Sequence, residues 1–530
     1  MSYTADSAGV IIKQESVSTI RSYEDTQLNP QGMILLSYYE TYRPNVWLVE
    51  LGAPEGEGAY TVTYDKNADD AVTGMPTDNK RYNAGDSLTL PPAPSRVNHD
   101  FAGWKIGEAI HSPGYEYTIS GNTTIIAQWI YNPTFEFKFI DEEYSYEPIV
   151  MNWALNDTNG NPVERNLPTS SDFAGKKKNH YLVAWDLNGT RYAPGAAYNP
   201  TTEGATFTAV WKEVWSGEAP TGDDIPAYNA ETNTYSIATG NQLAWFSKNG
   251  GSANVILTDD IYLNGFFRTD GTFVENWYET EANITSANKW STDYMIPSYS
   301  GTFDGKGHTI YGFYASNGDN QPAGLFTAIK TGGILKNVNL KGAYVVAADE
   351  GSSKSSSFVS IVSAQVTGGT IDTVAVGGKI GIAEGGYVNF IGSITARING
   401  TASIIKNCTS DVYIDLHGMN TNPHGGNISK ADSRGLGGIV GCNNIKDTVI
   451  ENCVNNGEIY APYYQKIGGI VGNVYAVTKI TNCTNSAKIT HAATVGTYGG
   501  AGKIVGYINS NRATITNPTE GGELVPFTAE

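Results

Sequence analysis

The segment from residue 266 to residue 299 gathers the side chains best suited to ligand recognition. Aromatic residues stand there among Asn, Glu and Thr, namely Phe266, Phe267, Phe273, Trp277, Tyr278, Trp290 and Tyr294. An aromatic face beside polar groups suits stacking on a sugar ring, and exposed aromatic side chains are common contact anchors. Large apolar side chains are more often buried than displayed, so the alternative is that these rings pack the segment onto the protein.

Carboxylates near this segment suggest acid–base chemistry as a second interpretation. The candidates are Asp259, Asp260, Asp304 and Asp372, with His308 close to Asp304 in sequence. Cleavage of a glycosidic bond needs two carboxylates at a defined separation, and a metal-assisted site needs a carboxylate cluster. Each of these aspartates stands in a turn composition or at the end of an expected strand, which already accounts for it. We therefore predict no catalytic residue.

The remaining motifs for metals and cofactors are missing from the sequence. The seven histidines contain no His-Glu-x-x-His, and His417 and His424 share a segment without an identifiable third metal ligand. No phosphate-binding loop, dinucleotide fingerprint or Gly-x-Ser-x-Gly motif is present. The sequence predicts no metal and no cofactor.

The charge of the chain limits its partners. The net charge is −19, with only 16% charged residues, so the chain offers no basic surface for nucleic acid or for anionic lipid. No run of 18 apolar residues occurs, so we expect no insertion into a membrane. The first residues lack a secretory signal, and the last ones lack a wall-sorting motif.

The elements that must position the aromatic segment belong to an internal repeat. Gly-Gly-Ile-Val-Gly occurs at 437–441 and again at 468–472, and Asn-Cys occurs at 452–453 and at 482–483. A unit of about 30 residues with three short β-type segments cannot bury its own apolar side chains, so it must stack on its neighbours. Residues 253–530 are therefore predicted to form a right-handed parallel β-helix.

The same Asn position recurs along this region at Asn337, Asn407, Asn452, Asn482 and Asn517. Stacked Asn side chains at a bend are expected to bond to one another. Cys408, Cys453 and Cys483 follow three of them, and Cys442 is the fourth cysteine. Parallel stacking at about 4.8 Å is slightly too wide for a disulfide, so we expect a row of buried thiols.

A short helix is expected at residues 241–247, within a junction that spans 214–252. Leu243, Ala244 and Phe246 supply its apolar side, and residues able to cap a helix precede it. At this place it would cover the open end of the β-helix, where unpaired strand edges invite aggregation.

Residues 234–520 resemble the GLUG-motif repeat proteins. The resemblance includes the helix and the Phe-Asp-Gly-Lys-Gly-His-Thr-Ile segment at 303–310. Such repeats occur in bacterial surface adhesins and some surface proteases, so the resemblance implies a surface-exposed solenoid without specifying a ligand.

Two smaller β modules are expected at 58–132 and 133–213. Phe-Ala-Gly-Trp at 101–104 and Trp129 recur as Leu-Val-Ala-Trp at 182–185 and Trp211, with tryptophan spacings of 25 and 26 residues (104 to 129, 185 to 211). Both copies resemble the internalin B-repeat, a β-grasp-like module of extracellular proteins. The resemblance implies a spacer or adhesive role. The second copy departs from the pattern at Tyr181 and Ala184.

Residues 1–57 are expected to form a β arm or docking domain. Strands are predicted at 33–36 and 46–49, with a turn at 43–45. If the carrier is a virion, this segment is the part expected to dock on capsid or tail proteins.

Together these features predict an all-β, non-catalytic, elongated surface protein that binds a host-surface glycan or protein. The missing signal and anchor slightly favour a phage fibre or capsid decoration protein over a bacterial cell-surface adhesin. A β-helix polysaccharide lyase or glycoside hydrolase is the other alternative. A homo-oligomer is compatible with the sequence.

Overall fold

The structure is a computed structural model. It describes residues 2–5, 10–15, 33–40, 43–51, 58–138, 140–141, 144–145, 148–155, 161–169, 179–200, 204–317, 321–348, 355–419, 434–493 and 498–528. These residues are almost entirely strands and turns, as the sequence predicts.

The chain divides into two compact units. The first consists of Met1–Phe139, Glu147–Asn166 and Ala197–Thr208, and the second of Ile140–Tyr146, Leu167–Ala196 and Ala209–Glu530.

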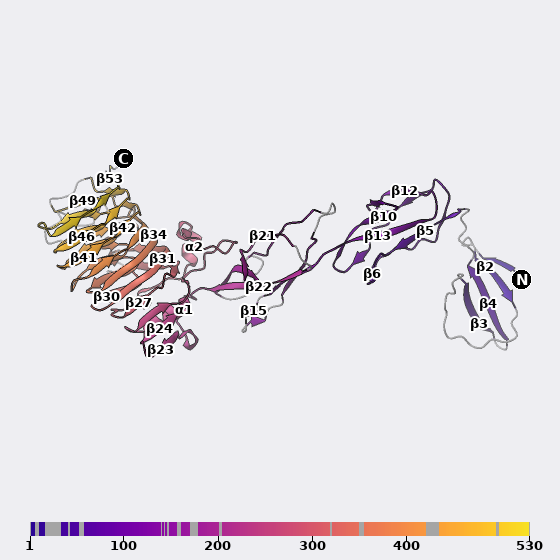
Figure 1. Cartoon of the computed structure of the whole chain (residues 1–530), viewed down its shortest axis with the longest axis horizontal. Coiled ribbons are helices and arrows are strands. Elements are labelled where there is room, and N and C mark those ends of the chain that lie inside the picture. The colour runs from indigo at the N-terminus through magenta and orange to yellow at the C-terminus, as the bar shows by residue number, and fades with distance from the viewer. Residues whose placement is uncertain are drawn as a thin grey trace. The chain divides into compact units, whose positions relative to one another are not determined.

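The first unit begins with an antiparallel sheet in the order β1-β2-β4-β3 (Figure 1). Its strands are β1 (Ser2–Ala5), β2 (Val10–Glu15), β3 (Met33–Glu40) and β4 (Arg43–Leu51). The two strands predicted here are present as β3 and β4. Residues 43–45, which were expected to be a turn, belong to β4 instead, and Pro44 pairs with Tyr39. Proline is accepted there because β2 pairs only with residues 46–51 of β4, which leaves Pro44 at an edge.

A compact β module follows in the same unit. Its strands are β5 (Tyr60–Asp65), β6 (Val72–Thr73), β7 (Arg81–Tyr82), β8 (Ser87–Thr89), β9 (Ser95–Arg96), β10 (His99–Ile106), β11 (Ala109–His111), β12 (Glu116–Thr118) and β13 (Thr123–Tyr131). Trp104 is fully buried among Val62, Leu90 and Ile125, and its indole N–H donates to the Pro91 carbonyl at 2.9 Å. A core this small depends on such large aromatic anchors.

The segment predicted as the second module is shared between the two units. Its strands are β14 (Thr134–Lys138), β15 (Ile140–Asp141), β16 (Tyr144–Ser145), β17 (Ile149–Asn152), β18 (Arg165–Asn166), β19 (His180–Leu187), β20 (Thr190–Tyr192), β21 (Ala197–Tyr198) and β22 (Gly204–Glu213). Trp185 repeats the anchor of Trp104, because it is fully buried and donates to the Pro168 carbonyl at 2.8 Å. The hairpins β10–β11 and β19–β20 also share one register, because Trp104 lies opposite His111 and Trp185 lies opposite Tyr192.

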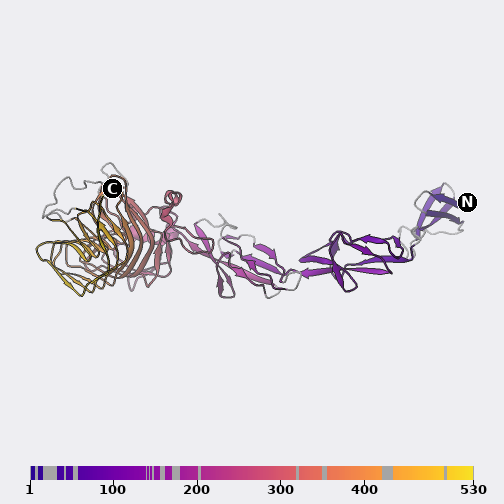
Figure 2. The same ribbon diagram turned by 90° about the horizontal axis from the view of Figure 1, so that it is seen from above.

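Most of the second unit is a set of sheets that we call the parallel stack, residues 227–526. Figure 1 and Figure 2 show its strands side by side in chain order. Its longest sheet begins with β23 (Ala227–Asn229), β24 (Thr234–Ile237), β25 (Asn254–Leu257), β26 (Ile261–Tyr262), β27 (Thr302–Asp304), β28 (Thr309–Tyr311), β29 (Tyr314–Asn317), β31 (Ile334–Ala347), β34 (Thr370–Ile382), β37 (Ile404–Lys406) and β38 (Thr409–Asp415). It continues with β41 (Thr448–Glu451), β42 (Val454–Asn455), β43 (Ile459–Tyr460), β46 (Thr478–Thr481), β47 (Thr484–Asn485), β48 (Ile489–His491), β51 (Ala513–Thr516), β52 (Thr519–Glu520) and β53 (Leu524–Pro526).

Two shorter parallel sheets complete the stack. One contains β30 (Phe326–Lys330), β33 (Ser363–Thr367), β36 (Thr395–Ile398), β40 (Val440–Asn443), β45 (Val471–Val474) and β50 (Val505–Ile508). The other contains β32 (Ser355–Val359), β35 (Tyr387–Gly392), β39 (Gly435–Gly437), β44 (Lys466–Gly468) and β49 (Gly500–Gly502). β23 pairs antiparallel with β24. From β24 onward the chain returns repeatedly to these sheets, and each strand pairs in parallel with its counterpart in the next repeat. Like residues therefore lie beside like residues.

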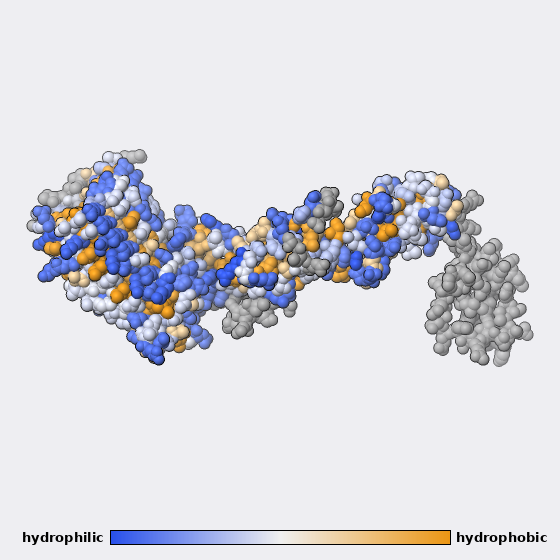
Figure 3. All heavy atoms as spheres, in the orientation of Figure 1, coloured by the Kyte–Doolittle hydropathy of each residue, from blue (hydrophilic) through white to orange (hydrophobic). Residues whose placement is uncertain are grey.

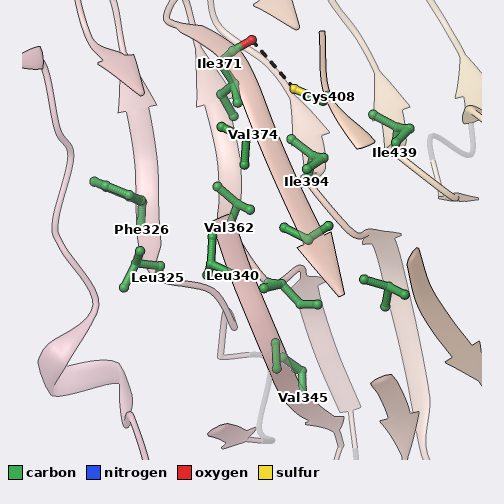
Figure 4. Packing of buried hydrophobic residues seen from close by; sticks show 14 of the residues in the cluster. Leu325, Phe326, Leu340, Val345, Val362, Ile371, Val374, Ile394, Cys408 and Ile439 are labelled. Atoms are coloured by element: carbon green, nitrogen blue, oxygen red, sulfur yellow. Dashed lines mark hydrogen bonds between the residues drawn. The ribbon is translucent and has the colours of Figure 1, made fainter. Parts of the chain in front are cut away.

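The core of the stack consists of aligned aliphatic side chains. Ile450 pairs with Ile480, and Val440 pairs with Val471, all fully buried. Figure 4 shows this packing around Leu340, Ile371 and Ile394, with Ile439 in a neighbouring repeat. Burying each such side chain contributes roughly 1.5–3 kcal/mol to the stability of the stack. Figure 3 shows hydrophilic residues interspersed with small hydrophobic patches over the visible face.

The four cysteines are free and buried, as expected. Cys408, Cys453 and Cys483 lie in successive repeats, and the contact with Cys408, together with burial, raises the pKa of the Cys453 thiol. A protonated, enclosed thiol is unreactive.

The helix predicted at 241–247 is α1 (Gly240–Asn249). The Thr239 side chain caps it by accepting from the Gln242 backbone N–H, and Leu243, Ala244 and Phe246 join the core of the stack. Shorter helices are η2 (Gly222–Asp224), η3 (Trp277–Glu279), α2 (Glu281–Ser286) and η4 (Thr292–Tyr294). The stack begins with β23 and β24, inside the expected junction of residues 214–252, because β24 pairs in parallel with β25.

Candidate functional site

The aromatic segment leaves the stack after β26 and returns before β27. Asn264, which is 2% exposed, ties the two ends together. Its side-chain amide donates to the carbonyls of Asn288 (3.0 Å) and Gly312 (2.7 Å), and its oxygen accepts from the Asn288 backbone N–H at 2.6 Å. Because a buried amide is costly to leave unpaired, these bonds fix where the segment leaves the stack.

A bulge in β31 receives the middle of the segment. The register with β34 shifts between Leu340 and Ala343, and Gly342 in the bulge has φ +58°. The Trp277 indole N–H donates to the Gly342 carbonyl at 2.8 Å. A Cβ atom on Gly342 would lie 2.8 Å from the Phe273 ring, so only glycine lets the segment approach this closely.

The seven predicted ring residues fall into two groups. The first group packs on outward-facing tyrosines of the stack, and Tyr278 stacks on Tyr344 with 5.1 Å between ring centroids. Within the group, Trp277 stacks on Phe266 with 4.6 Å between ring centroids. The members of this group are Phe266, Phe267, Phe273, Trp277 and Tyr278. Trp277 is only 1% exposed, so its ring supports the segment and is closed to a ligand.

The second group lies beside α1 and contains Trp290 and Tyr294. Trp290 packs edge-on against Trp215 at 5.1 Å, and Lys248 of α1 lies 4.5 Å from the Tyr294 ring centroid. Trp290 is 2% exposed, so this ring is also closed to a ligand. For both tryptophans the structure therefore matches the packing alternative, whereas ligand binding by the half-buried rings stays a prediction.

Tyr181 of β19 also contacts the aromatic segment. Its ring centroid lies 5.1 Å from that of Phe267, within the second unit. The first repeat module has Asp100 at the corresponding position, since Trp104 of β10 aligns with Trp185 of β19. The departure from the repeat pattern at Tyr181 thus coincides with a contact to the aromatic segment.

An open groove of about 450 Å³ lies beside the first ring group. That volume is in the range of small-molecule sites. The groove is lined by three parts of the chain: the aromatic segment, β31, and the strands β34 and β38. The lining residues are Glu275, Asn276, Tyr278, Asn339, Leu340, Lys341, Ala375, Val376, Gly377, Gly378, Asp411 and Tyr413.

Gly377 forms the floor of the groove because glycine has no side chain. Val376 pairs with Leu340, and Gly377 pairs with Asp411, so Lys341, Gly377 and Asp411 occupy neighbouring places in three successive strands. A Cβ atom on Gly377 would meet no atom within 4 Å. Because adjacent strands lie about 4.8 Å apart, the strands on either side of Gly377 are separated by roughly 10 Å.

Charged side chains stand on both sides of this gap. The Lys341 ammonium lies 3.1 Å from the Glu275 carboxylate, and this bond and charge raise the pKa of Lys341, with a further contribution from Asp411. Asp411 accepts a hydrogen bond from the Asn456 side chain at 2.9 Å. The groove thus presents one cation and two carboxylates, with excess negative charge.

Two tyrosines border the groove. Burial raises the pKa of Tyr278, and the nearby Glu279 and Glu275 raise it further. Burial raises the pKa of Tyr413 to about 12, with a contribution from Asp415. Both hydroxyls therefore stay protonated at neutral pH and can donate or accept hydrogen bonds.

The carboxylates singled out from the sequence each have a partner within the second unit. Burial alone would raise the pKa of Asp304, but hydrogen bonds from the Asn337 side chain and the Lys306 backbone, together with Lys336, lower it to about 2. Asp372 lies 3.2 Å from Lys406, Asp259 lies 2.8 Å from Lys212, and Asp260 lies 3.5 Å from His308.

Metal coordination finds no support in the described part of the chain, which contains no cluster of three or more His, Cys, Asp or Glu side chains. His417 stacks on Tyr460 and contacts Asp415. His424 lies outside the described residues.

Sequence reasoning missed most of the groove. Lys341, Gly377, Asp411 and Tyr413 come from three repeats and only become neighbours through strand register. The only signal in the sequence is the outward-facing glycine at 377, where the neighbouring repeats carry larger polar side chains.

Two family models match parts of this chain. The Listeria-Bacteroides repeat domain matches residues 60–128, which is the first β module. The GLUG motif matches residues 463–490, which lie in the parallel stack. A search of curated proteins finds none that matches the chain. Repeat domains typical of bacterial surface proteins are therefore present.

Among the residues that the structure describes, no helix has the length and apolarity that a bilayer crossing requires.

Proposed function

We propose that this chain is a non-catalytic, extracellular surface protein whose parallel stack presents a binding site for a glycan or protein on a host surface. In this proposal the stack is a right-handed parallel β-helix, and α1 caps its N-terminal end. The matched surface-protein repeats support the setting. The groove beside the aromatic segment is the observation that carries the binding role.

The packing of α1 supports its role as a cap. Phe246 of α1 packs edge-on against Tyr299 at 6.2 Å, and Leu243 is fully buried in the same core. A helix over the first coil shields aliphatic side chains that no preceding coil covers.

One proposed carrier is the bacterial cell surface, and repeats typical of bacterial surface proteins support this choice. A phage fibre or capsid decoration protein, which the sequence slightly favours, is the other proposed carrier, with residues 1–57 as the docking segment. Mass spectrometry of washed cells and of purified virions distinguishes the two carriers.

The test is a binding assay with the labelled full chain on host cells and on a glycan array. We expect saturable binding to at least one surface and no release of reducing sugar from any bound glycan. Absence of saturable binding to every surface would remove the proposed function.

A glycoside hydrolase is the second candidate because two carboxylates, Glu275 and Asp411, line one groove. Such enzymes use a carboxylate pair about 5–10 Å apart. Reducing-sugar release that disappears in both Glu275→Gln and Asp411→Asn would establish this alternative. We expect no release from the unmodified chain, since the Glu275 carboxylate is held by Lys341.

A further inference from the structure

We propose that the gap above Gly377 is a saccharide subsite that selects a neutral hexose or N-acetylhexosamine over acidic sugars. This inference rests on the proposed surface-binding function and names the ligand class of the same groove. It follows from the shape of the gap, from its rims and from its charge.

The shape of the gap suits one sugar ring. Side chains at the neighbouring places, Lys341 and Asp411, stand on strands that are separated by two strand spacings, roughly 10 Å. Between them Gly377 leaves the backbone bare, and a Cβ atom there would meet nothing within 4 Å. A ring that enters this gap would take the place of the missing side chain.

The rims supply the contacts that sugars use. Tyr278 stands on one side, held by its stacking on Tyr344 at 5.1 Å with an angle of 22° between the ring planes. Tyr413 stands on the other side, with the Lys379 ammonium 5.4 Å from its ring centroid. Rings that are already held in place lose little conformational entropy when a ligand packs on them.

The charges of the groove determine which sugars fit. Asp411 can accept hydrogen bonds from two neighbouring sugar hydroxyls, and the Asn339 side chain, which also lines the groove, can donate and accept. Lys341 is paired with Glu275 at 3.1 Å, so one ammonium faces two carboxylates and the groove keeps an excess of negative charge. A sialic acid or a sulfated sugar would bring a second negative charge to this place and would be repelled.

The decisive comparison places the same bulky residue inside and outside the groove. Gly377→Tyr fills the gap. Gly381→Tyr is the matched control, because Gly381 lies on the same strand β34, outside the groove lining, and a Cβ atom there has no neighbour closer than 3.9 Å. Circular dichroism and the melting temperature check that both full-length variants fold.

Both variants and the unmodified chain are applied to an array of neutral, N-acetylated, sialylated and sulfated oligosaccharides. We expect the unmodified chain and Gly381→Tyr to bind the same neutral or N-acetylated members, and Gly377→Tyr to lose at least about tenfold in affinity. Asp411→Asn, which conserves size, should lose about tenfold, as expected for a hydrogen bond to a charged group.

Three results would overturn the inference and leave surface binding intact. They are unchanged binding by Gly377→Tyr, a preference for sialylated or sulfated members, and saturable binding to cells without binding to any saccharide. Failure of the unmodified chain to bind cells as well as glycans would instead remove the proposed function itself.

Discussion

Two lines of outward-facing residues run along the long sheet of the parallel stack, and they differ in regularity. We call the first the Asn row, which consists of Asn337, Thr373, Asn407, Asn452, Asn482 and Asn517. All its members have φ between 49° and 55°. The second, the groove line, changes residue type at every repeat and consists of Lys341, Gly377, Asp411, Asn456 and Ser486.

The Asn row is continuous over its later members. The Asn452 side chain donates to Asn407 at 3.1 Å, Asn482 donates to Asn452 at 3.1 Å, and Asn517 donates to Asn482 at 3.2 Å. This confirms the bonding between stacked asparagines that the sequence predicts. Each amide satisfies its neighbour, so the row has no free place for a ligand.

The groove line instead contains a gap. Asn456 donates to Asp411, and Ser486 donates to Asn456 at 2.6 Å, but the next place, at Gly377, has no side chain. The difference indicates that repetition stabilises the stack, whereas a site for recognition arises where the repetition is interrupted. Three predictions test this contrast through the Asn row.

The largest effect is expected at the centre of the Asn row. Asn452→Val places a β-branched residue at φ 51° and removes the bonds to Asn407 and Asn482. We expect a loss of about 2–3 kcal/mol in the free energy of unfolding of the stack. The measurement is urea unfolding of the full chain, with the transition of the β modules as an internal reference.

Asn452→Gly is the matched control for the backbone. Glycine adopts this conformation without strain, so only the hydrogen bonds are lost, at a cost of about 1 kcal/mol. Equal losses for the valine and glycine variants would contradict the role of the left-handed bend.

The next effect depends on pH and concerns the start of the Asn row. The pKa of Asp304 is about 2, below the ordinary 3.8, while its side chain accepts from Asn337. Its contribution to stability is therefore complete above about pH 4 and is lost as the pH falls towards 2. We expect at most about 2 kcal/mol, since solvent screens the lysine partners.

Acid titration of the unfolding free energy checks this prediction. Asp304→Asn should flatten the pH dependence of the stack transition below about pH 4. An unchanged slope would show that Asp304 contributes nothing to acid sensitivity. Asp372, whose pKa is also lowered, accounts for part of the slope that remains.

The smallest effect is a stabilisation. Thr373 is the one member of the Asn row that is not asparagine, and it holds φ 55°, a conformation that β-branched residues disfavour. Thr373→Asn is expected to raise the free energy of unfolding by about 1 kcal/mol. A decrease in urea midpoint would show that the contact of the Thr373 hydroxyl with Asp372, at 2.9 Å, matters more than the backbone.

The repeating part of the fold could be predicted because its signals are local. Asn452 and Asn482 hold the same place in consecutive repeats. One repeat cannot bury Ile450 by itself, so the repeats must stack with equivalent residues beside one another. The helix at α1 was equally local, since Thr239 and the apolar residues after it lie within one short segment.

The groove could not be predicted because it depends on register between repeats of unequal length. Asp411 and Lys341 are far apart in sequence, and a bulge between Leu340 and Ala343 shifts their alignment. The hydrogen-bond partner of Trp277 was equally hidden, because it is the carbonyl of Gly342, a backbone atom that leaves no trace in residue types.

The Asn row also has a direction. Every side-chain amide of the row points its N–H₂ group towards the preceding repeat, and the row starts on carboxylates, at Asp304 for Asn337 and at Asp372 for Asn407. Between Asn407 and Asn517 donor and acceptor are the same residue type, so a duplicated repeat could join there without altering either neighbour. Gene duplication can therefore lengthen the protein in its C-terminal half at little energetic cost, whereas an insertion beside Asp372 would separate Asn407 from its carboxylate.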